Sequence, residues 1–230
     1  MKLENVSKSF WKDNKKLEIF KNLNVTFEKG KFYIILGSSG SGKSTLINML
    51  GLLDTIDSGK YTIENEEVDT TSNLAKIRLE HIGFIFQSHY LNPRLNVFDN
   101  VYIASLINPN ISKNLRKKRV NEMLNLVDLF NRDNHMPSEI SGGEASRVCI
   151  ARALINEPTF ILADEPTGSL DYKNAQNIMK IFRKLVDNGK CVILVTHDLN
   201  NLKYGDIIYE IKNKKLVEVR KNDILKKCNK

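Results

Sequence analysis

The most specific chemical pattern in this chain is a run of glycine, serine, lysine and threonine at positions 37–45, Gly-Ser-Ser-Gly-Ser-Gly-Lys-Ser-Thr. It matches the phosphate-binding loop G-x-x-x-x-G-K-[ST] at every required position. Glycines let several backbone N–H groups face one anion, and the following helix adds its positive N-terminal end. Lys43 is expected to reach the β- and γ-phosphates of a nucleotide, and Ser44 to bind Mg²⁺. The candidate nucleotide-binding residues of the loop are Gly37, Ser38, Ser39, Gly40, Ser41, Gly42, Lys43, Ser44 and Thr45.

A second pattern that could do chemistry is an apolar stretch, residues 159–163, that ends in two acids. Asp164 suits the coordination shell of Mg²⁺, and Glu165 suits a general base that polarises water for attack on a γ-phosphate. The alternative is an ordinary strand followed by an acidic turn. The intact phosphate loop upstream favours the catalytic interpretation.

Three short apolar runs would position these groups: residues 32–36, 159–163 and 191–195. Their length and their β-branched or aromatic content are typical of central strands in a parallel sheet covered on both faces. Each run is followed by polar residues, and ligands bind at the carboxyl ends of strands in open α/β sheets. We therefore expect three strand ends to converge on one site. A lone histidine is more often structural, but His197 follows the third run and becomes a site candidate.

The flanking regions show other periodicities. Period-two spacing of apolar residues from Leu17 to Phe27 predicts antiparallel strands with a turn at Lys21-Asn22. Hairpins are predicted around residues 61–68 and from 207 to 219, the latter turning at Asn213-Lys214. From residue 96 to 154 the pattern is helical, and Ser112 is a plausible N-cap. The apolar face predicted for that helix comprises Val120, Met123, Leu124, Val127 and Phe130.

Composition narrows the class of protein. At 230 residues, 41% hydrophobic and 27% charged, the chain is typical of one globular domain, with or without subdomains. No apolar run approaches the roughly 18 residues of a membrane span, and the start lacks the apolar stretch of a signal peptide, so a cytoplasmic location is expected. The three cysteines form no C-x-x-C pair, which disfavours a disulfide framework or metal cluster. The net charge of +8 could indicate that the protein binds nucleic acid or an anionic membrane. The favoured explanation is that the excess positive charge lies on solvated helix faces and in the lysine-rich tail.

The run Ser141-Gly142-Gly143-Glu144 has two interpretations. S-x-x-E is a capping box at the start of a helix. However, glycine costs about 1 kcal/mol relative to alanine inside a helix, so two glycines do not help the helix itself. Glycines do allow a backbone to approach a ligand closely. The run therefore predicts a second phosphate-binding helix N-terminus, and a nucleotide clamped from two sides.

These motifs together resemble the nucleotide-binding subunits of ABC transporters. Residues 141–171 read SGGEASRVCIARALINEPTFILADEPTGSLD, with the family's motifs in the family's order and spacing. The similarity extends from about residue 3 to 219, and ILADEPTGSLD and FIFQSHYLNP are closest to the group that drives lipoprotein release, macrolide efflux and antimicrobial-peptide export or resistance. The resemblance implies one ABC-type ATP-binding domain over residues 1–230. Its fold would be α/β: a P-loop NTPase core with a mainly parallel sheet, an N-terminal antiparallel β subdomain, and an inserted α-helical subdomain at roughly 88–155.

The resemblance also implies roles for residues outside the phosphate loop. Phe10 matches the aromatic residue that stacks on adenine, with Trp11 as the neighbouring alternative. Gln87 matches the glutamine that contacts Mg²⁺ and senses the membrane partner. Asp171 belongs to a loop that crosses the dimer interface, and His197 matches the histidine that holds the γ-phosphate. The expected catalytic residues are Lys43, Glu165 and His197, the expected metal ligands Ser44, Gln87 and Asp164, and the signature residues that bind nucleotide Ser141, Gly142, Gly143 and Glu144.

This chain departs from the family pattern around the signature, but no departure removes a catalytic group. Ile140 replaces the usual leucine, and Glu144 stands where many members have glutamine, although this branch often has glutamate. Ala145 and Ser146 replace a polar or basic pair. The resemblance therefore implies an active ATPase. The remaining histidines, His81, His89 and His135, are assigned structural roles.

The partners implied by the resemblance are ATP with Mg²⁺, a second copy of the chain in the ATP-bound state, and an integral membrane permease subunit on a separate chain. The protein would lie on the inner face of the cell membrane and power export of a peptide, an antibiotic or a lipid-linked substrate. Residues 87–100 are expected to dock the permease, with Tyr90 and Leu91 as candidate anchors.

Two alternatives differ from transport. Relatives of the cell-division type transmit force to cell-wall hydrolases through a membrane partner, and the sequence does not separate them from transporters. DNA-acting relatives carry a long coiled coil or zinc insert before the signature. Only 53 residues separate Gln87 from Ser141, without heptads or zinc spacing, so no nucleic-acid partner is expected. Translation-type factors fuse two such domains, and only one is present.

Overall fold

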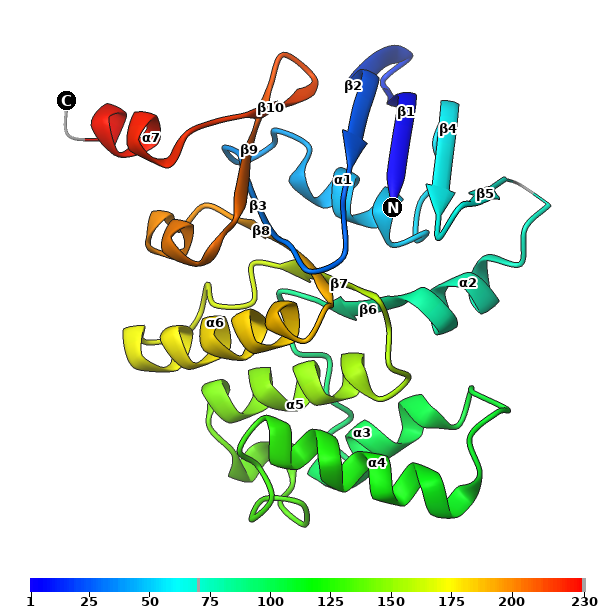
Figure 1. The fold of residues 1–230 in the computed structure, drawn as a ribbon, viewed down its shortest axis with the longest axis vertical. Coiled ribbons are helices and arrows are strands. Elements are labelled where there is room, and N and C mark those ends of the chain that lie inside the picture. The colour runs from blue at the N-terminus through cyan, green and yellow to red at the C-terminus, as the bar shows by residue number, and fades with distance from the viewer. Residues whose placement is uncertain (70, 229–230) are drawn as a thin grey trace.

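A computed structural model describes residues 1–69 and 71–228, and its framework is a pair of β-sheets with helices around them (Figure 1). The first sheet has four antiparallel strands in the order β2-β1-β4-β5. The second has six strands in the order β10-β9-β3-β8-β7-β6, all parallel except for the antiparallel pair β9–β10. The strands of the first sheet are β1 (Lys2–Lys12), β2 (Lys15–Thr26), β4 (Ser58–Ile63) and β5 (Glu66–Val68). Those of the second are β3 (Phe32–Leu36), β6 (Ile82–Ile85), β7 (Phe160–Asp164), β8 (Cys191–Thr196), β9 (Ile207–Lys212) and β10 (Lys215–Glu218).

The three apolar runs identified in the sequence are central strands, as predicted. All five residues of β3 and all six of β8 are buried. The parallel register pairs Leu36 of β3 with Thr196 of β8, and Val195 of β8 with Asp164 of β7. The three strands therefore end at the same level, and the polar residues that follow them meet at one edge of the sheet.

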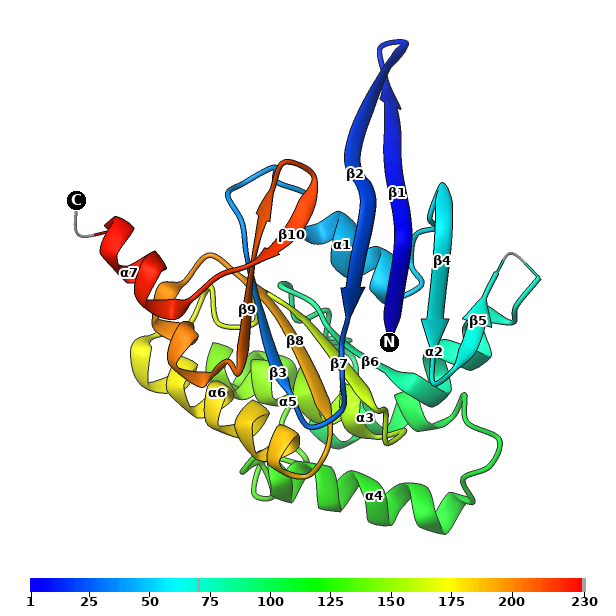
Figure 2. The same ribbon diagram turned by 45° about the horizontal axis from the view of Figure 1, so that its top comes forward.

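Helices cover both faces of the six-stranded sheet because its side chains alternate between two cores. Along β3, Phe32, Ile34 and Leu36 belong to one cluster of buried residues, and Tyr33 and Ile35 belong to the other. The second cluster also holds the buried side of α1 (Lys43–Leu50) and of the antiparallel sheet, which Figure 2 shows on the same side of β3, β7 and β8. The first cluster is covered by α3 (Val97–Ser105), α4 (Lys113–Leu126), α5 (Gly142–Leu154) and α6 (Tyr172–Asp187).

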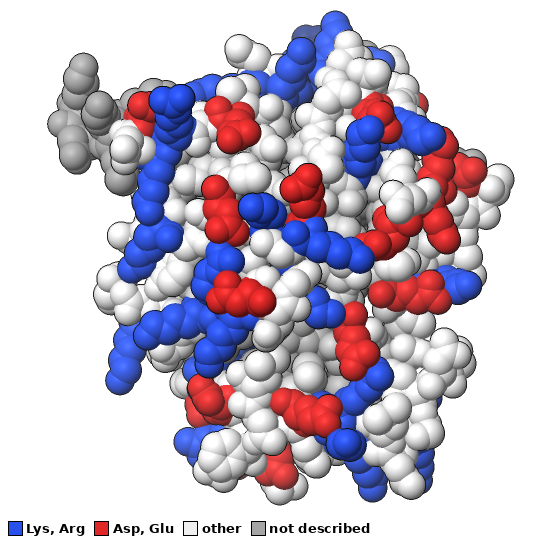
Figure 3. Space-filling view, viewed as in Figure 1, with Lys and Arg blue, Asp and Glu red and all other residues white. Residues whose placement is uncertain are grey.

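The remaining elements are short. They are α2 (Leu74–His81), the 3₁₀ helices η1 (Pro137–Glu139) and η2 (Leu199–Tyr204), and α7 (Lys221–Cys228). Within the described part of the chain, no helix has the length and apolar character needed to cross a membrane. Helices α3, α4 and α5 pack together at one end of the molecule, in the segment where a helical subdomain is expected. On the face in Figure 3, basic and acidic side chains are interspersed, as expected of a solvated surface.

The predicted turn at Lys21-Asn22 is wrong. β2 runs without interruption from Lys15 to Thr26 and pairs with β1, with register shifts that mark bulges along the pair. Asn22 has a φ of 48°, which an asparagine at a bulge tolerates. The turn lies instead at Asp13-Asn14, where both φ angles are positive (49° and 57°), the pattern of a tight hairpin.

Two other local predictions are confirmed, and one needs correction. The hairpin from β9 to β10 turns at Asn213-Lys214, both with positive φ. Ser112 caps α4 by accepting a hydrogen bond from the Leu115 N–H at 3.4 Å. The prediction that Phe130 belongs to the buried face is wrong, because α4 ends at residue 126 and Phe130 is 61% exposed.

Candidate functional site

A cavity of about 730 Å³ lies where the carboxyl ends of β3, β7 and β8 meet. It brings together most of the residues that the sequence singles out, from segments far apart along the chain. The residues around it are Phe10, Ile19, Gly37, Ser38, Ser39, Gly40, Gly42, Lys43, Ser44, Thr45, Gln87, Asp164, Glu165 and His197. Of the predicted phosphate-loop residues only Ser41 is missing. It faces a smaller cavity between the loop, β2 and the β9–β10 hairpin, and its Oγ is buried without a hydrogen-bond partner among the residues that the structure describes.

The phosphate loop depends on glycine where the chain enters α1. Gly42 has a φ of 103°, a left-handed conformation that residues with a Cβ rarely adopt. A Cβ at this position would also lie 2.7 Å from Ile19 Cγ2. Among the residues that the structure describes, no side chain caps α1, so N–H groups of its first turn are left without a capping acceptor. These donors and the positive end of the helix suit an anionic phosphate.

Lys43 places its charge over the same loop. Its Nζ donates hydrogen bonds to the carbonyl oxygens of Gly37 (2.8 Å) and Ser38 (3.0 Å). The ammonium group is therefore held beside the uncapped helix end, and the two together form a donor set of the kind that binds polyphosphate. The residues present fit the phosphate groups of a nucleotide.

The acidic pair lies at the end of β7, next to the loop. Burial raises the pKa of Asp164, and the charge of Glu165 raises it further, against the opposing effects of Lys43 and of a hydrogen bond from the Ser44 hydroxyl. A half-buried carboxylate bonded to a hydroxyl, with a side-chain amide in the same cavity, is an oxygen donor set that suits Mg²⁺. Ser44, Gln87 and Asp164 therefore fit this ion.

Glu165 is fixed by contacts at both its backbone and its side chain. Its N–H donates to the Val195 carbonyl at 2.9 Å, which ties the residue to β8, and its φ of 45° turns the chain sharply after the strand. Its Oε1 lies 3.0 Å from His197 Nδ1. The Glu165 side chain is 14% exposed and that of His197 67%. A carboxylate held beside a phosphate-binding loop and paired with an imidazole can orient and deprotonate a water molecule.

The structure separates the two aromatic candidates for adenine stacking. Phe10 lines the cavity and is 40% exposed, with Lys8 Nζ 4.9 Å from its ring centroid. Trp11 is 74% exposed and does not line the cavity. This placement favours Phe10 as the residue that would contact the base.

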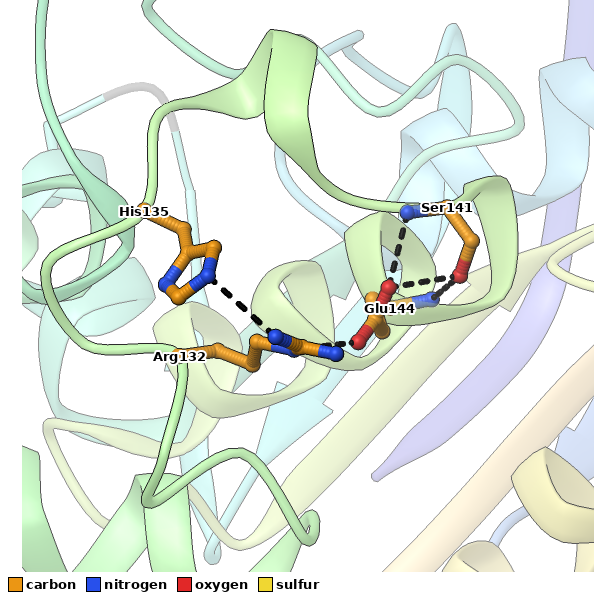
Figure 4. A network of polar contacts seen from close by, with 4 residues as sticks. All are labelled: Arg132, His135, Ser141 and Glu144. Carbon is orange, nitrogen blue, oxygen red and sulfur yellow. Dashed lines mark hydrogen bonds and ion pairs between the residues drawn. The ribbon is translucent and has the colours of Figure 1, made fainter.

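The signature residues 141–144 and Asp171 do not line this cavity. Ser141 and Glu144 form a reciprocal capping box at the start of α5, which Figure 4 shows from close by. The Ser141 N–H donates to Glu144 Oε2 at 2.8 Å, and the Glu144 N–H donates to Ser141 Oγ at 3.3 Å. The hydrogen bond from the Ser141 N–H, followed by those from the Ser141 hydroxyl and Arg132, lowers the pKa of Glu144 to about 2. Asp171 caps α6 by accepting from the Asn174 N–H at 2.9 Å.

The two glycines of the signature have different surroundings. A Cβ on Gly143 would lie 2.6 Å from Asn174 Cγ, so a larger residue here would force Asn174 to shift where α5 packs against the start of α6. A Cβ on Gly142 would meet only Leu170 Cδ2, at 3.8 Å, which is an ordinary contact. No residue in the described part of the chain requires glycine at position 142. The space above it is open to another molecule.

Sequence reasoning missed a set of contacts that join α5 to the segment after Gln87. Arg152 donates to the carbonyl oxygens of His89 and Tyr90, both at 2.8 Å, and Cys149 Sγ donates to the His89 carbonyl at 3.0 Å. His89 Nε2 is hydrogen-bonded to Ser146 Oγ at 2.8 Å. Burial, and the nearby charge of Arg152, lower the pKa of His89. The sequence does place Ser146, Cys149 and Arg152 three residues apart, and so on one face of a helix. It did not indicate which segment the face would contact.

Comparisons with known proteins agree with this geometry. The family model described as "ABC transporter" matches residues 20–168. An uncharacterised ABC transporter ATP-binding protein, YvrO of Bacillus subtilis, is 42% identical and covers 96% of this chain and 97% of its own length. The macrolide export ATP-binding/permease protein MacB of Shewanella is 40% identical over 90% of this chain, which spans only 32% of that protein.

A solved structure gives the same result for the fold. It is described as the dimeric, post-hydrolysis state of the ATP-binding cassette MJ0796 bound to ADP and Pi. It superimposes on this chain with a TM-score of 0.86 at 38% identity, and the match covers 96% of this chain and 98% of that one. The predicted fold class is confirmed.

Proposed function

The chain belongs to the ABC transporter family, as an ATP-hydrolysing, ATP-binding subunit, and on that premise we propose that two copies close head-to-tail around ATP and drive an integral membrane subunit. The observation that carries the proposal is the cavity at the strand ends, where the phosphate loop faces Asp164, Glu165 and His197. The proposed membrane subunit is an integral membrane protein on a separate chain.

The residues of the cavity divide the chemistry between them. The loop N–H groups and Lys43 bind the β- and γ-phosphates, and Phe10 stacks on the base. Glu165 accepts a proton from the attacking water, and His197, which contacts Glu165 in this structure, turns to hold the γ-phosphate. Ser44, Gln87 and Asp164 would hold Mg²⁺, and the bound ion would supply positive charge to offset that of the phosphate oxygens.

The proposal assigns the signature residues to the nucleotide of the second copy. Ser141, Gly142, Gly143 and Glu144 lie outside the cavity of their own chain, and the surface at Gly142 is open. The start of α5 presents a positive helix end, so it suits a phosphate that arrives bound to another molecule. Asp171 would lie in the same interface. The dimeric state of the MJ0796 cassette supports this arrangement.

The proposed docking surface for the membrane subunit consists of Phe86 and Tyr90. Tyr90 is 71% exposed, and its ring meets that of Phe86 edge to face at 5.7 Å. The contacts of Arg152 and Cys149 hold the Tyr90 segment against α5, so this anchor is presented rigidly. Leu91, the second anchor expected from the sequence, is partly buried and packs against the larger core cluster, so we place the anchor at Tyr90.

The proposed output is export of a peptide, an antibiotic or a lipid-linked molecule, with the subunit bound to the inner face of the cell membrane. The similarity to macrolide export proteins supports export. The alternative, force transmission to an extracellular enzyme without transport, uses the same site and the same docking surface. Identifying the membrane protein that co-purifies with this chain separates the two.

A mixing experiment tests the head-to-tail dimer. Lys43→Ala and Gly142→Asp should each abolish ATPase activity, the first by removing a phosphate ligand and the second by placing a carboxylate against the phosphates. A mixed dimer retains one undamaged composite site, so mixing the two variants should restore activity, provided that a single site turns over. Lys180→Ala, which removes an exposed lysine from α6, is the matched control. Loss of ATP affinity in isolated Gly142→Asp monomers would argue instead for a contact within one chain.

A further inference from the structure

The loop before the signature carries an arginine that contacts the capping box. Arg132 Nε donates to Glu144 Oε1 at 2.8 Å, and Arg132 Nη1 lies 3.2 Å from His135 Nε2 (Figure 4). The other carboxylate oxygen, Glu144 Oε2, accepts from the N–H and the hydroxyl of Ser141, both at 2.8 Å. The guanidinium and the helix end therefore hold the carboxylate from two sides.

A carboxylate at this position conflicts with the proposed role of the helix end. A glutamate in the first turn stabilises a helix, but its negative charge repels a phosphate that approaches the same N–H groups. The low pKa of Glu144 keeps the group ionised at neutral pH. A bound guanidinium offsets that charge, because charge-assisted Arg–carboxylate bonds combine attraction with fixed geometry.

We propose that Arg132 is a positioning residue that neutralises and orients Glu144, so that the start of α5 can receive the phosphates of a nucleotide bound to a second copy of the chain. The inference rests on the head-to-tail dimer proposed above. Arg132 does not touch the nucleotide in this proposal. It acts through Glu144.

The loop itself does not depend on the arginine side chain. Its backbone is fastened to the start of α3, where the Val97 N–H donates to the His135 carbonyl at 2.8 Å and the Phe98 N–H donates to the Asp133 carbonyl at 2.9 Å. The Arg132 side chain is 46% exposed, whereas that of Glu144 is 17% exposed. The guanidinium thus covers the carboxylate from the solvent side, and its loss should change charge more than fold.

The test is a double-mutant cycle in isolated chains carrying Glu165→Gln, which keeps ATP intact. The quantity measured is the ATP concentration at half-maximal dimerisation, by analytical ultracentrifugation. Arg132→Gln should raise it about tenfold when Glu144 is present, because the uncompensated charge faces the phosphates. In the Glu144→Gln background, where the amide preserves the capping box, the same change should have an effect below about twofold. Arg132→Lys, which keeps the charge, should recover most of the loss.

Controls separate charge from folding. Arg220→Gln removes an exposed arginine elsewhere and should not alter the ATP requirement. Thermal unfolding without ATP should place Arg132→Gln close to its parent. An equal loss in both backgrounds, or no rescue by Arg132→Lys, would overturn this inference and leave the dimer standing. A parent that never dimerises with ATP would overturn the dimer and this inference together.

Discussion

The adjacent glycines of the signature should respond oppositely to the same small change. Gly142→Ala and Gly143→Ala each add one methyl group within the first turn of α5. At 143 the new Cβ would lie 2.6 Å from Asn174 Cγ and 2.7 Å from its Oδ1, well inside van der Waals contact. At 142 it would lie 3.8 Å from Leu170 Cδ2.

The magnitudes follow from these distances. Overpacking of this kind costs about 1–3 kcal/mol, while exchanging glycine for alanine in a helix returns up to about 1 kcal/mol. Gly143→Ala should therefore destabilise the chain by about 1–2 kcal/mol. The displaced Asn174 side chain would also lose its 2.6 Å hydrogen bond to Asp171. Gly142→Ala should be neutral or stabilise by up to about 1 kcal/mol, because the helix benefits and nothing is displaced.

The assay is thermal unfolding of the isolated chain without nucleotide, where no second copy is bound. A difference of about 2 kcal/mol between the variants corresponds to about 4–8 °C in Tm for a domain of this size. With ATP, the order should reverse for dimerisation in the Glu165→Gln background, since a methyl group at 142 occupies the open surface that the second copy would approach. Equal Tm values for the two variants, or a destabilised Gly142→Ala chain, would refute the packing argument.

Three further predictions concern the site, the docking surface and pH. Glu165→Gln should bind ATP but hydrolyse it very slowly, because an amide cannot accept the proton from water. Gel filtration with ATP and Mg²⁺ should then detect a stable dimer. A fully ATP-loaded monomer would count against the two-copy site. Tyr90→Ser should leave the basal ATPase rate of the isolated subunit largely intact while weakening co-purification with the membrane subunit. If the complex formed by this variant still shows full stimulated ATPase turnover, the docking surface lies elsewhere. The pKa of Glu144 is lowered from 4.5 to about 2, so its bonds stabilise the fold above about pH 4.5 and that stability is lost as pH falls toward 2. Urea unfolding should give the natural chain a larger free energy of unfolding than Glu144→Gln, by on the order of 1–3 kcal/mol at neutral pH. This difference should shrink as the pH falls from about 4.5 toward 2. A difference that stays constant with pH would contradict the lowered pKa of Glu144.

Much of the fold could be predicted because its signals are local. A phosphate loop needs glycines and a lysine at fixed spacing, and a central parallel strand needs a short continuous apolar run. Both properties are visible in a few consecutive residues, and β3, β7 and β8 lie where the runs predicted. Their shared carboxyl edge followed from a general rule about parallel sheets, which is why the grouping of Lys43, Glu165 and His197 could be anticipated.

Errors arose where local pattern competes with pairing between segments. Lys21-Asn22 has the composition of a turn, yet β1 pairs along the full length of β2 and absorbs Asn22 as an irregularity. Leu91 is predicted from the sequence as a docking anchor in a surface loop, yet its partly buried side chain packs against the larger core cluster. Neither outcome is encoded in neighbouring residues alone.

The sequence by itself determined which chemistry the chain can perform, because the residues that bind phosphate and polarise water are specified by type and short-range spacing. Only the tertiary structure decided which of those residues share a cavity and which face outward. Phe10 rather than Trp11 lines the cavity. A side chain at position 143 would press on Asn174 of another helix, whereas one at position 142 would make only an ordinary contact. Arg132 reaches Glu144 across a loop. These distinctions depend on distances between side chains of different elements, which are set only when the sheets and helices pack together.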